Sequence, residues 1–164
     1  MNILKVTLVL LILLSVGTVV QAESIEWHTY DAGTILAKEQ NKPVMIDFYA
    51  DRCGWCVMLD NETYMDPEVI ATSKEFVNIK VDTDVDYKLA FEYGVENLPT
   101  IVFTDPNGEE TYRVVGYRDG DIFNKIMLAV VNGEEPPQQQ SPGFGSLLGL
   151  SALAIVWLVR SKYT

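Results

Sequence analysis

The sequence predicts an α/β domain with a mixed central sheet and helices on both faces of that sheet. The first observation is that strand-like and helix-like segments alternate from residue 24 onward. The second is the nearly continuous apolar run 43–50, which is typical of a strand buried at the centre of a sheet. The third is a pair of strand-like runs around the turn signal Asp-Pro-Asn-Gly at 105–108. Alternation that ends in such a hairpin indicates parallel and antiparallel strands in one sheet.

The first elements are a short strand and a helix. Ile25 and Trp27 alternate with polar neighbours in the segment 24–30, which predicts a strand at the edge of the sheet. A helix is expected over 31–42, and Asp31 is its expected N-cap. The buried strand follows, and the next helix begins directly after it.

The middle of the chain continues the alternation. Asp66 as N-cap and Pro67 at the first helical position predict a helix over 66–76. The run 76–84 reads as a strand, and 85–94 as a helix closed by a glycine.

The last elements are the antiparallel hairpin and a final helix. The two strands of the hairpin fall within 98–117, and the helix within 119–133. The apolar residues expected on one face of that helix are Ile122, Ile126, Ala129 and Val130.

The two ends of the chain are unlike globular sequence and divide it into four predicted segments. Residues 1–22 have the positive start, apolar run and small-residue ending of a secretory signal peptide; an uncleaved N-terminal anchor is the alternative. Residues 144–164 hold a long uncharged run followed by basic residues, which predicts a C-terminal transmembrane anchor or sorting signal. Between them, 23–133 is the predicted domain and 134–143 a flexible linker. The basic residues after the anchor predict that the domain lies outside the cytoplasm.

The predicted domain is strongly acidic. All 23 Asp and Glu residues lie between Glu23 and Glu135, together with nine Lys or Arg, so this segment carries 9 − 23 = −14. A field of this sign excludes nucleic acid as a partner.

The only two cysteines, Cys53 and Cys56, stand three positions apart directly after the buried strand. Such a pair beside a βαβ pattern is typical of a redox centre. Cys53, at a helix N-terminus, is the expected nucleophile, since free N–H groups there stabilise a thiolate; Cys56 is the resolving thiol. A stabilising disulfide is the alternative, although so short a loop removes little chain entropy. No metal is expected, because structural zinc needs four Cys or His ligands and the chain adds only His28.

Asp47 interrupts the apolar strand six residues before Cys53. Burial of a carboxylate raises its pKa, so Asp47 beneath the cysteine pair would exchange a proton with Cys56 as that thiol attacks. The alternative is that strand alternation leaves Asp47 in water.

The segments 44–56, 94–103 and 105–117 resemble the thioredoxin superfamily across nearly the whole predicted domain. The resemblance implies the thioredoxin fold, a buried acid at Asp47 and a cis-proline at Pro99. The residues that it implies as substrate contacts are Gly54, Trp55, Leu98 and Pro99.

The segments 61–84, 98–103 and 114–123 are similar to the C-terminal thioredoxin-like domain of DsbD-type thiol:disulfide interchange proteins. That resemblance implies a reductant of protein disulfides outside the cytoplasmic membrane. It also implies a membrane-embedded electron donor of the DsbD or CcdA type. No cofactor is implied, because the redox-active disulfide Cys53–Cys56 carries both electrons.

The motif departs from typical thioredoxins at two positions. Arg52 stands where most thioredoxins have Trp, and Trp55 stands in place of the proline of their Gly-Pro pair. Arg52 favours a thiolate at Cys53 whereas Asp51 opposes it, so the redox potential stays open.

The tail and one asparagine carry further motifs. Residues 141–145, Ser-Pro-Gly-Phe-Gly, begin a segment similar to the PGF-type C-terminal sorting signal of archaeal surface proteins, in which the tail is replaced by a lipid; a plain anchor is the alternative. Asn61 opens an N-glycosylation sequon.

Together these features predict a thiol-disulfide oxidoreductase anchored at the extracytoplasmic face of the cell membrane, where it reduces protein disulfides. One alternative is a disulfide oxidase or isomerase that uses the same site. The other is a non-enzymatic, surface-tethered binding module.

Overall fold

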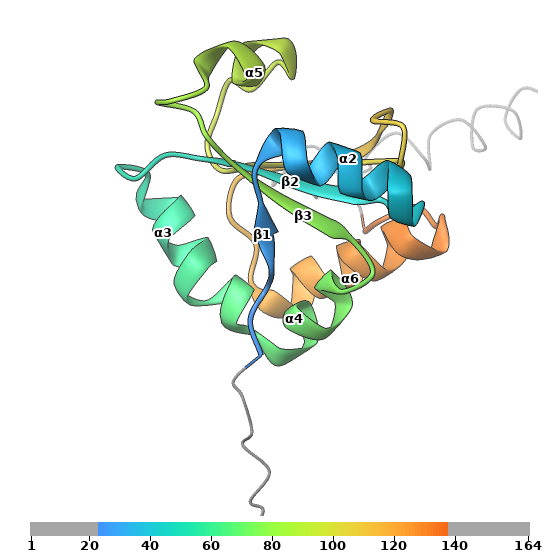
Figure 1. The fold of residues 1–164 in the computed structure, drawn as a ribbon. Helices are drawn as coiled ribbons and strands as arrows, with labels where there is room; N and C mark the ends of the chain where they lie inside the picture. Colours follow the sequence, from blue (N-terminus) through green and yellow to red (C-terminus); the bar gives the residue numbers. More distant parts are fainter. Residues whose placement is uncertain (1–22, 138–164) are drawn as a thin grey trace, which may run out of the picture.

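A computed structural model of the protein describes residues 23–137, which form a sheet between two helical layers (Figure 1). The strands of this part are β1 (Trp27–His28), β2 (Val44–Tyr49), β3 (Val77–Asp82), β4 (Thr100–Thr104) and β5 (Glu110–Val115). The helices are α2 (Tyr30–Gln40), α3 (Gly54–Asn61), α4 (Pro67–Ser73), α5 (Tyr87–Glu92) and α6 (Gly120–Asn132), with a 3-10 turn η1 (Thr63–Met65). The predicted order of helices and strands is confirmed.

The sheet is mixed, as the hairpin at its end predicted. Its strand order is β1-β3-β2-β4-β5. The strands β1 and β2 run parallel to β3, whereas β4 is antiparallel to both β2 and β5. The first strand pairs with β3 alone, so the predicted edge strand is confirmed.

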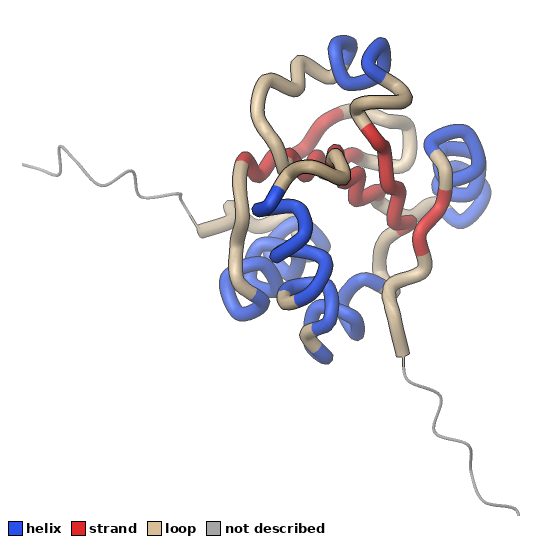
Figure 2. Tube along the Cα trace, turned by 90° about the vertical axis from the view of Figure 1, so that its left-hand side faces the viewer, coloured by secondary structure: helices blue, strands red, loops and turns tan. Residues whose placement is uncertain are grey.

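Helices α3, α4 and α6 cover one face of the sheet, and α2 and α5 cover the other (Figure 2). Each face has its own apolar core. Leu59, Phe103 and Phe123 lie in the first core, and Ile46 and Phe48 in the second. The central strand β2 contributes to both cores, which explains why its sequence is almost uniformly apolar.

The N-cap predicted for α4 is confirmed. A carboxylate oxygen of Asp66 accepts hydrogen bonds from the backbone N–H groups of Glu68 and Val69, at 2.8 and 3.2 Å. Pro67 occupies the first helical position, as its fixed φ and missing N–H favour.

The N-cap predicted for α2 is wrong. The helix begins at Tyr30, so Asp31 lies in the first turn and Thr29 is the N-cap, without a side-chain hydrogen bond. The reason is a tertiary contact: the Tyr30 hydroxyl lies 2.9 Å from that of Tyr93, and the ring packs against the second core. This docking moves the N-cap two residues before the local capping signal at Asp31.

The apolar face predicted for α6 is displaced by one residue at its start. Ile122 is 42% exposed, whereas Phe123 is fully buried. The aromatic ring of Phe123 lies against Tyr64 and Phe103, with ring centroids 5.8 and 6.3 Å apart. The larger side chain therefore takes the core position and turns Ile122 toward water, while Ile126, Ala129 and Val130 pack as predicted.

Within residues 23–137, no helix is both long and apolar enough to cross a bilayer. The predicted signal peptide (1–22) and C-terminal anchor or sorting signal (144–164) lie outside the described residues and stay predictions.

Candidate active site

The two cysteines lie at the start of α3, where they form a disulfide with a Cα–Cα distance of 5.2 Å. Cys53 is the N-cap residue, and its sulfur accepts a hydrogen bond from the backbone N–H of Cys56 at 3.1 Å. Cys53 is partly exposed, whereas Cys56 is buried beneath the first turn. A partner can therefore reach Cys53 only, and the helix N–H groups stabilise negative charge on its sulfur.

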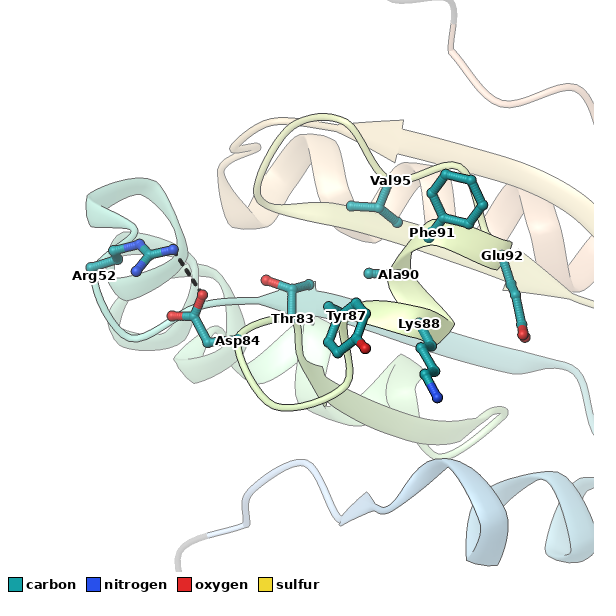
Figure 3. Close-up of a pocket in the computed structure, with 9 residues that line it drawn as sticks. All are labelled: Arg52, Thr83, Asp84, Tyr87, Lys88, Ala90, Phe91, Glu92 and Val95. Carbon is teal, nitrogen blue, oxygen red and sulfur yellow. Dashed lines mark hydrogen bonds and ion pairs between the residues drawn. The ribbon is translucent and has the colours of Figure 1, made fainter.

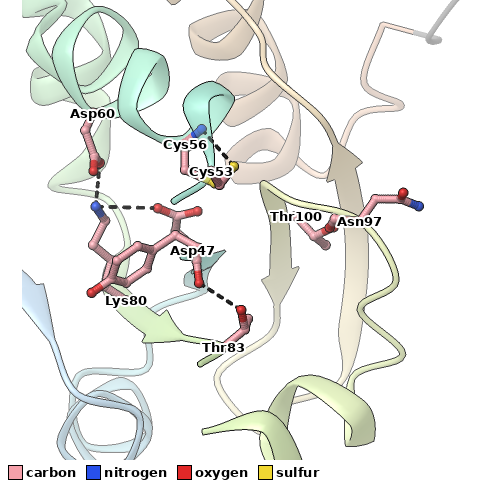
Figure 4. Close-up of a disulfide and its surroundings, with 9 residues drawn as sticks. Asp47, Cys53, Cys56, Asp60, Lys80, Thr83, Asn97 and Thr100 are labelled. Atoms are coloured by element: carbon pink, nitrogen blue, oxygen red, sulfur yellow. Dashed lines mark hydrogen bonds and ion pairs between the residues drawn. A yellow bond between two sulfur atoms is a disulfide. The ribbon is translucent and has the colours of Figure 1, made fainter. Parts of the chain in front are cut away.

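Asp47 lies in β2 beneath the cysteine pair, with its carboxyl directed toward it (Figure 4). The residue is only 1% exposed, so the alternative of a solvated position is wrong. Burial raises the pKa of Asp47 from 3.8 to about 7, with a smaller contribution in the same direction from Asp60, while Lys80 and Tyr64 lower it. A carboxyl that titrates near neutral pH can both accept and return a proton, as disulfide exchange beside Cys56 requires.

Lys80 places a positive charge close to the Asp47 carboxylate. In the parallel register of β2 and β3, Lys80 stands directly opposite Asp47, and its Nζ lies 3.8 Å from a carboxylate oxygen. The same ammonium donates a hydrogen bond to Asp60 on α3. It also lies 4.6 to 5.8 Å from the ring centroids of three aromatic residues, which favour a cation. The aromatic residues are Trp27, Tyr49 and Tyr64.

Tyr64 faces Asp47 from η1. Its hydroxyl is close enough to lower the pKa of Asp47, but the two groups do not meet the geometry of a hydrogen bond. Within residues 23–137, the hydroxyl of Tyr64 and Oδ1 of Asp47 are both buried without a hydrogen-bond partner. A hydrogen-bond donor stabilises the ionised carboxylate. A small movement of the Tyr64 hydroxyl toward Asp47 would therefore make the proton of Asp47 easier to release.

A Tyr64→Phe variant is therefore expected to raise the pKa of Asp47 above its value of about 7. Loss of one neutral donor corresponds to a rise of about 0.5 to 1 pH unit. A carbon NMR titration of the Asp47 carboxyl measures it directly. Tyr49→Phe is the matched control, since it removes a phenolic oxygen from the same aromatic group. An unchanged midpoint in Tyr64→Phe would show that Tyr64 acts only through packing.

The surface around the disulfide is formed by Trp55 and Arg52, which are neighbours of the cysteines in sequence, and by side chains from two loops that hold Tyr117 and Asp84. Trp55 is 58% exposed, and its ring centroid lies 5.9 Å from that of Tyr117 in the loop before α6. The Tyr117 hydroxyl donates a hydrogen bond of 2.7 Å to Glu62, which fixes this aromatic pair at the edge of the site. On the other side, Arg52 pairs with Asp84 at 2.8 Å, so that carboxylate offsets part of its effect on a Cys53 thiolate.

The cis-proline implied by the resemblance is confirmed. The peptide bond between Leu98 and Pro99 is cis. Because Thr100 pairs with Phe48 in the antiparallel register, Pro99 lies at the end of the sheet from which the chain leaves for Cys53. The structure therefore brings Leu98 and Pro99 to the same end of the sheet as Gly54 and Trp55. Their contact with substrate stays a prediction.

Sequence reasoning identified the cysteines and Asp47 but missed Lys80, Asp60 and Tyr64. Two signals were available. Lys80 is the one basic residue of the alternating segment 77–82, and Asp60 lies four residues after Cys56, on the same side of α3. Neither signal alone connects these residues to Asp47, since that contact depends on the register between β2 and β3.

His28 lies in β1, and its nearest acidic partner is Glu26, 3.9 Å away. In the part of the chain that the structure describes, no three His, Cys, Asp or Glu side chains gather as a metal site would require.

Comparison with known proteins identifies the family of the domain. The family model described as "Thioredoxin-like domain" matches residues 30–130. The thiol:disulfide interchange protein DsbD of Vibrio vulnificus is 43% identical over 103 residues, which cover 59% of this chain and 17% of that protein. The chain thus matches about a sixth of the length of this relative. A thioredoxin H-type from Oryza sativa subsp. indica is 38% identical over 104 residues, covering 62% of this chain and 80% of that protein.

Two solved structures have a backbone fold similar to that of this chain. A thioredoxin from Thermus thermophilus has a TM-score of 0.60 at 29% identity, covering 65% of this chain and 87% of that one. The oxidised C-terminal domain of Neisseria meningitidis DsbD has a TM-score of 0.52 at 27% identity, covering 57% and 85%. The fold predicted from the sequence motifs is confirmed.

Proposed function

The chain belongs to the thioredoxin-like family and is a thiol-disulfide oxidoreductase with an active-site Cys53–Cys56 pair, and on this premise we propose that it reduces protein disulfides outside the cytoplasmic membrane. The observation that carries the disulfide exchange itself is the position of Asp47. A buried carboxyl with a pKa of about 7 lies beneath a shielded Cys56 and a partly exposed Cys53. The alternative of a non-enzymatic binding module does not account for this arrangement.

The reaction follows from which sulfur is accessible. In the dithiol form, the Cys53 thiolate attacks one sulfur of the partner's disulfide, and the other sulfur leaves as a thiolate that takes a proton from water. The Cys56 thiol then gives its proton to Asp47 and attacks the Cys53 sulfur. This step forms the Cys53–Cys56 disulfide and releases the second partner sulfur as a thiolate. Two electrons have moved to the partner, and an external thiol donor must restore the dithiol.

The direction and the location are supported by the likeness to DsbD and by the predicted terminal segments. Relatives with this domain are named thiol:disulfide interchange proteins, and the predicted signal peptide and anchor support a position of the domain at the extracytoplasmic face of the membrane. A DsbD- or CcdA-type membrane reductase is the proposed electron donor. Labelling of the reduced thiols in intact cells with a maleimide that does not cross membranes tests the location; protection of both thiols would contradict it.

The direction is tested by the redox potential of the full-length chain. Equilibration with reduced and oxidised glutathione, read by alkylation of the free thiols, is expected to give a value near that of thioredoxin, about −270 mV. The reduced chain should also reduce insulin in a turbidity assay. A potential near that of DsbA, about −120 mV, would support the oxidase alternative instead.

A further inference from the structure

The structure has a surface cavity of about 640 Å³ that is lined by Arg52 and by residues of α5 (Figure 3). One side of it is Arg52, the residue before Cys53, with its partner Asp84. The other side is α5, from which Tyr87 and Phe91 line the cavity. The size is that of pockets that accept side chains or small ligands.

The aromatic side chains of α5 are unusually exposed. Phe91 is 83% exposed and Tyr87 is 66% exposed, although both are large and the helix has other residues that contact the core. Leu89 and Ala90 supply those contacts. Folding therefore does not account for the position of Phe91, and covering it with another apolar group would be favourable.

The charges that line the cavity balance one another. Arg52 and Lys88 are offset by Asp84 and Glu92, and Arg52 and Asp84 are already paired. This balance contrasts with the strongly acidic domain as a whole. The cavity consequently offers no net field to a charged ligand, and its open aromatic faces favour an apolar one.

The cavity also continues the surface that disulfide exchange must use. A partner sulfur that bonds to Cys53 lies one residue away from Arg52, at the edge of the cavity. An extended polypeptide advances about 3.3 Å per residue, so a side chain a few positions from the partner's cysteine reaches α5.

We propose that the cavity between Arg52 and Phe91 is a specificity site that receives an aromatic or branched aliphatic side chain close in sequence to the cysteine of a protein partner. This inference rests on the proposed function, because it assigns the partner class of the same redox centre. Arg52 and Asp84 form its polar edge, and Tyr87 and Phe91 its apolar wall.

The test uses the reduced full-length chain and synthetic peptides of Ser and Gly, each with one cysteine activated as a mixed disulfide with thionitrobenzoate. A single Phe is moved through the positions on both sides of the cysteine. At one position, Phe is expected to raise the second-order rate constant of this single-turnover reaction about tenfold over Ser, as burial of part of one aromatic ring gives. Release of thionitrobenzoate, measured by absorbance, reports the attack of Cys53 on the peptide sulfur.

Phe91→Ser and Tyr87→Ser should reduce this preference to less than about twofold, because one apolar wall of the site is lost. Both residues are exposed, so the fold, checked by circular dichroism, and the reaction with the small bis(thionitrobenzoate) disulfide should not change. Ile35→Ser is the matched control: Ile35 is 60% exposed on α2, away from the cavity, and its loss should leave the preference intact.

Three results would overturn the inference: no preferred position for Phe, a preference for a charged residue, or a preference that survives Phe91→Ser. Association of the chain with itself that Phe91→Ser abolishes would also overturn it, since a second copy would then be the occupant. Failure to react with every thionitrobenzoate disulfide, including the small one, would instead contradict the proposed function.

Discussion

Replacement of Asp47 by Asn is expected to make the oxidised protein more stable above pH 7. Because the pKa of Asp47 is about 7 in the folded chain and near 3.8 when it is solvated, the unfolded chain releases this proton first as the pH rises. The native protein therefore loses stability between about pH 4 and pH 7, and the loss is complete above pH 7. A difference of this size corresponds to about 4 kcal/mol, which Asn does not incur.

Urea unfolding at a series of pH values measures this effect. The free energy of unfolding of wild type should fall from about pH 4 to pH 7, whereas that of Asp47→Asn should stay nearly level over the same range. Glu96→Gln, which changes an exposed carboxylate, is the control and should follow wild type. Equal stability of wild type and Asp47→Asn at pH 8 would mean that Lys80 offsets the whole cost of burying the charge.

The same substitution should slow the reaction that the buried charge serves. Without the carboxylate, the Cys56 thiol has no base beside it when it attacks the Cys53 sulfur of a mixed disulfide. Loss of a positioned general base corresponds to a slowing of about 100-fold near neutral pH. The rate of the resolving step in a single turnover measures this, and the first attack by Cys53 should change much less. If Asp47→Asn is more stable than wild type but slower in the resolving step, the buried carboxylate serves catalysis at a cost in stability.

The contrast between Asp47 and Lys80 shows how much of the site the sequence can predict. Asp47 stands out because a carboxylate inside an apolar strand has few explanations other than function. Lys80 has no such signal, because it takes a polar position in the alternating segment 77–82, and its role depends on which strand lies beside it. The pairing of β2 with β3 brings Lys80 opposite Asp47, and no local pattern determines that register.

The fold was predictable to a similar depth. Alternating patterns and the hairpin turn predicted the order of the elements, because each depends on neighbours in sequence. The start of α2 and the buried face of α6 were not predicted correctly, since Tyr30 and Phe123 take their positions from distant aromatic partners. The exposure of Phe91 was also not predictable, because the apolar pattern of α5 alone does not show which of its apolar residues contact the sheet.

The largest expected effect on activity comes from substitution of the two cysteines. Both substitutions should abolish turnover, but only one of them should leave partners bound in covalent adducts. Cys53→Ser removes the accessible sulfur, so the chain should neither reduce insulin nor form covalent adducts. Cys56→Ser retains the attacking sulfur but cannot resolve the mixed disulfide, so partners should accumulate in covalent complexes with Cys53. Turnover should fall to background in both variants, and only the adducts distinguish them.

The different roles of Cys53 and Cys56 follow from the burial of Cys56 rather than from the spacing of the two cysteines. Cys56 is 3% exposed and its backbone N–H donates to the Cys53 sulfur, so the two thiols cannot exchange roles without opening the first turn of α3. Mass spectrometry of adducts that form on the full-length Cys56→Ser chain in its native membrane reads out this asymmetry and identifies the partners. Adducts on Cys53→Ser instead would assign the attack to Cys56 and reverse the mechanism. If the α5 cavity selects partners as proposed, the trapped cysteines should have an apolar residue nearby in sequence, and Phe91→Ser in the same background should reduce their yield.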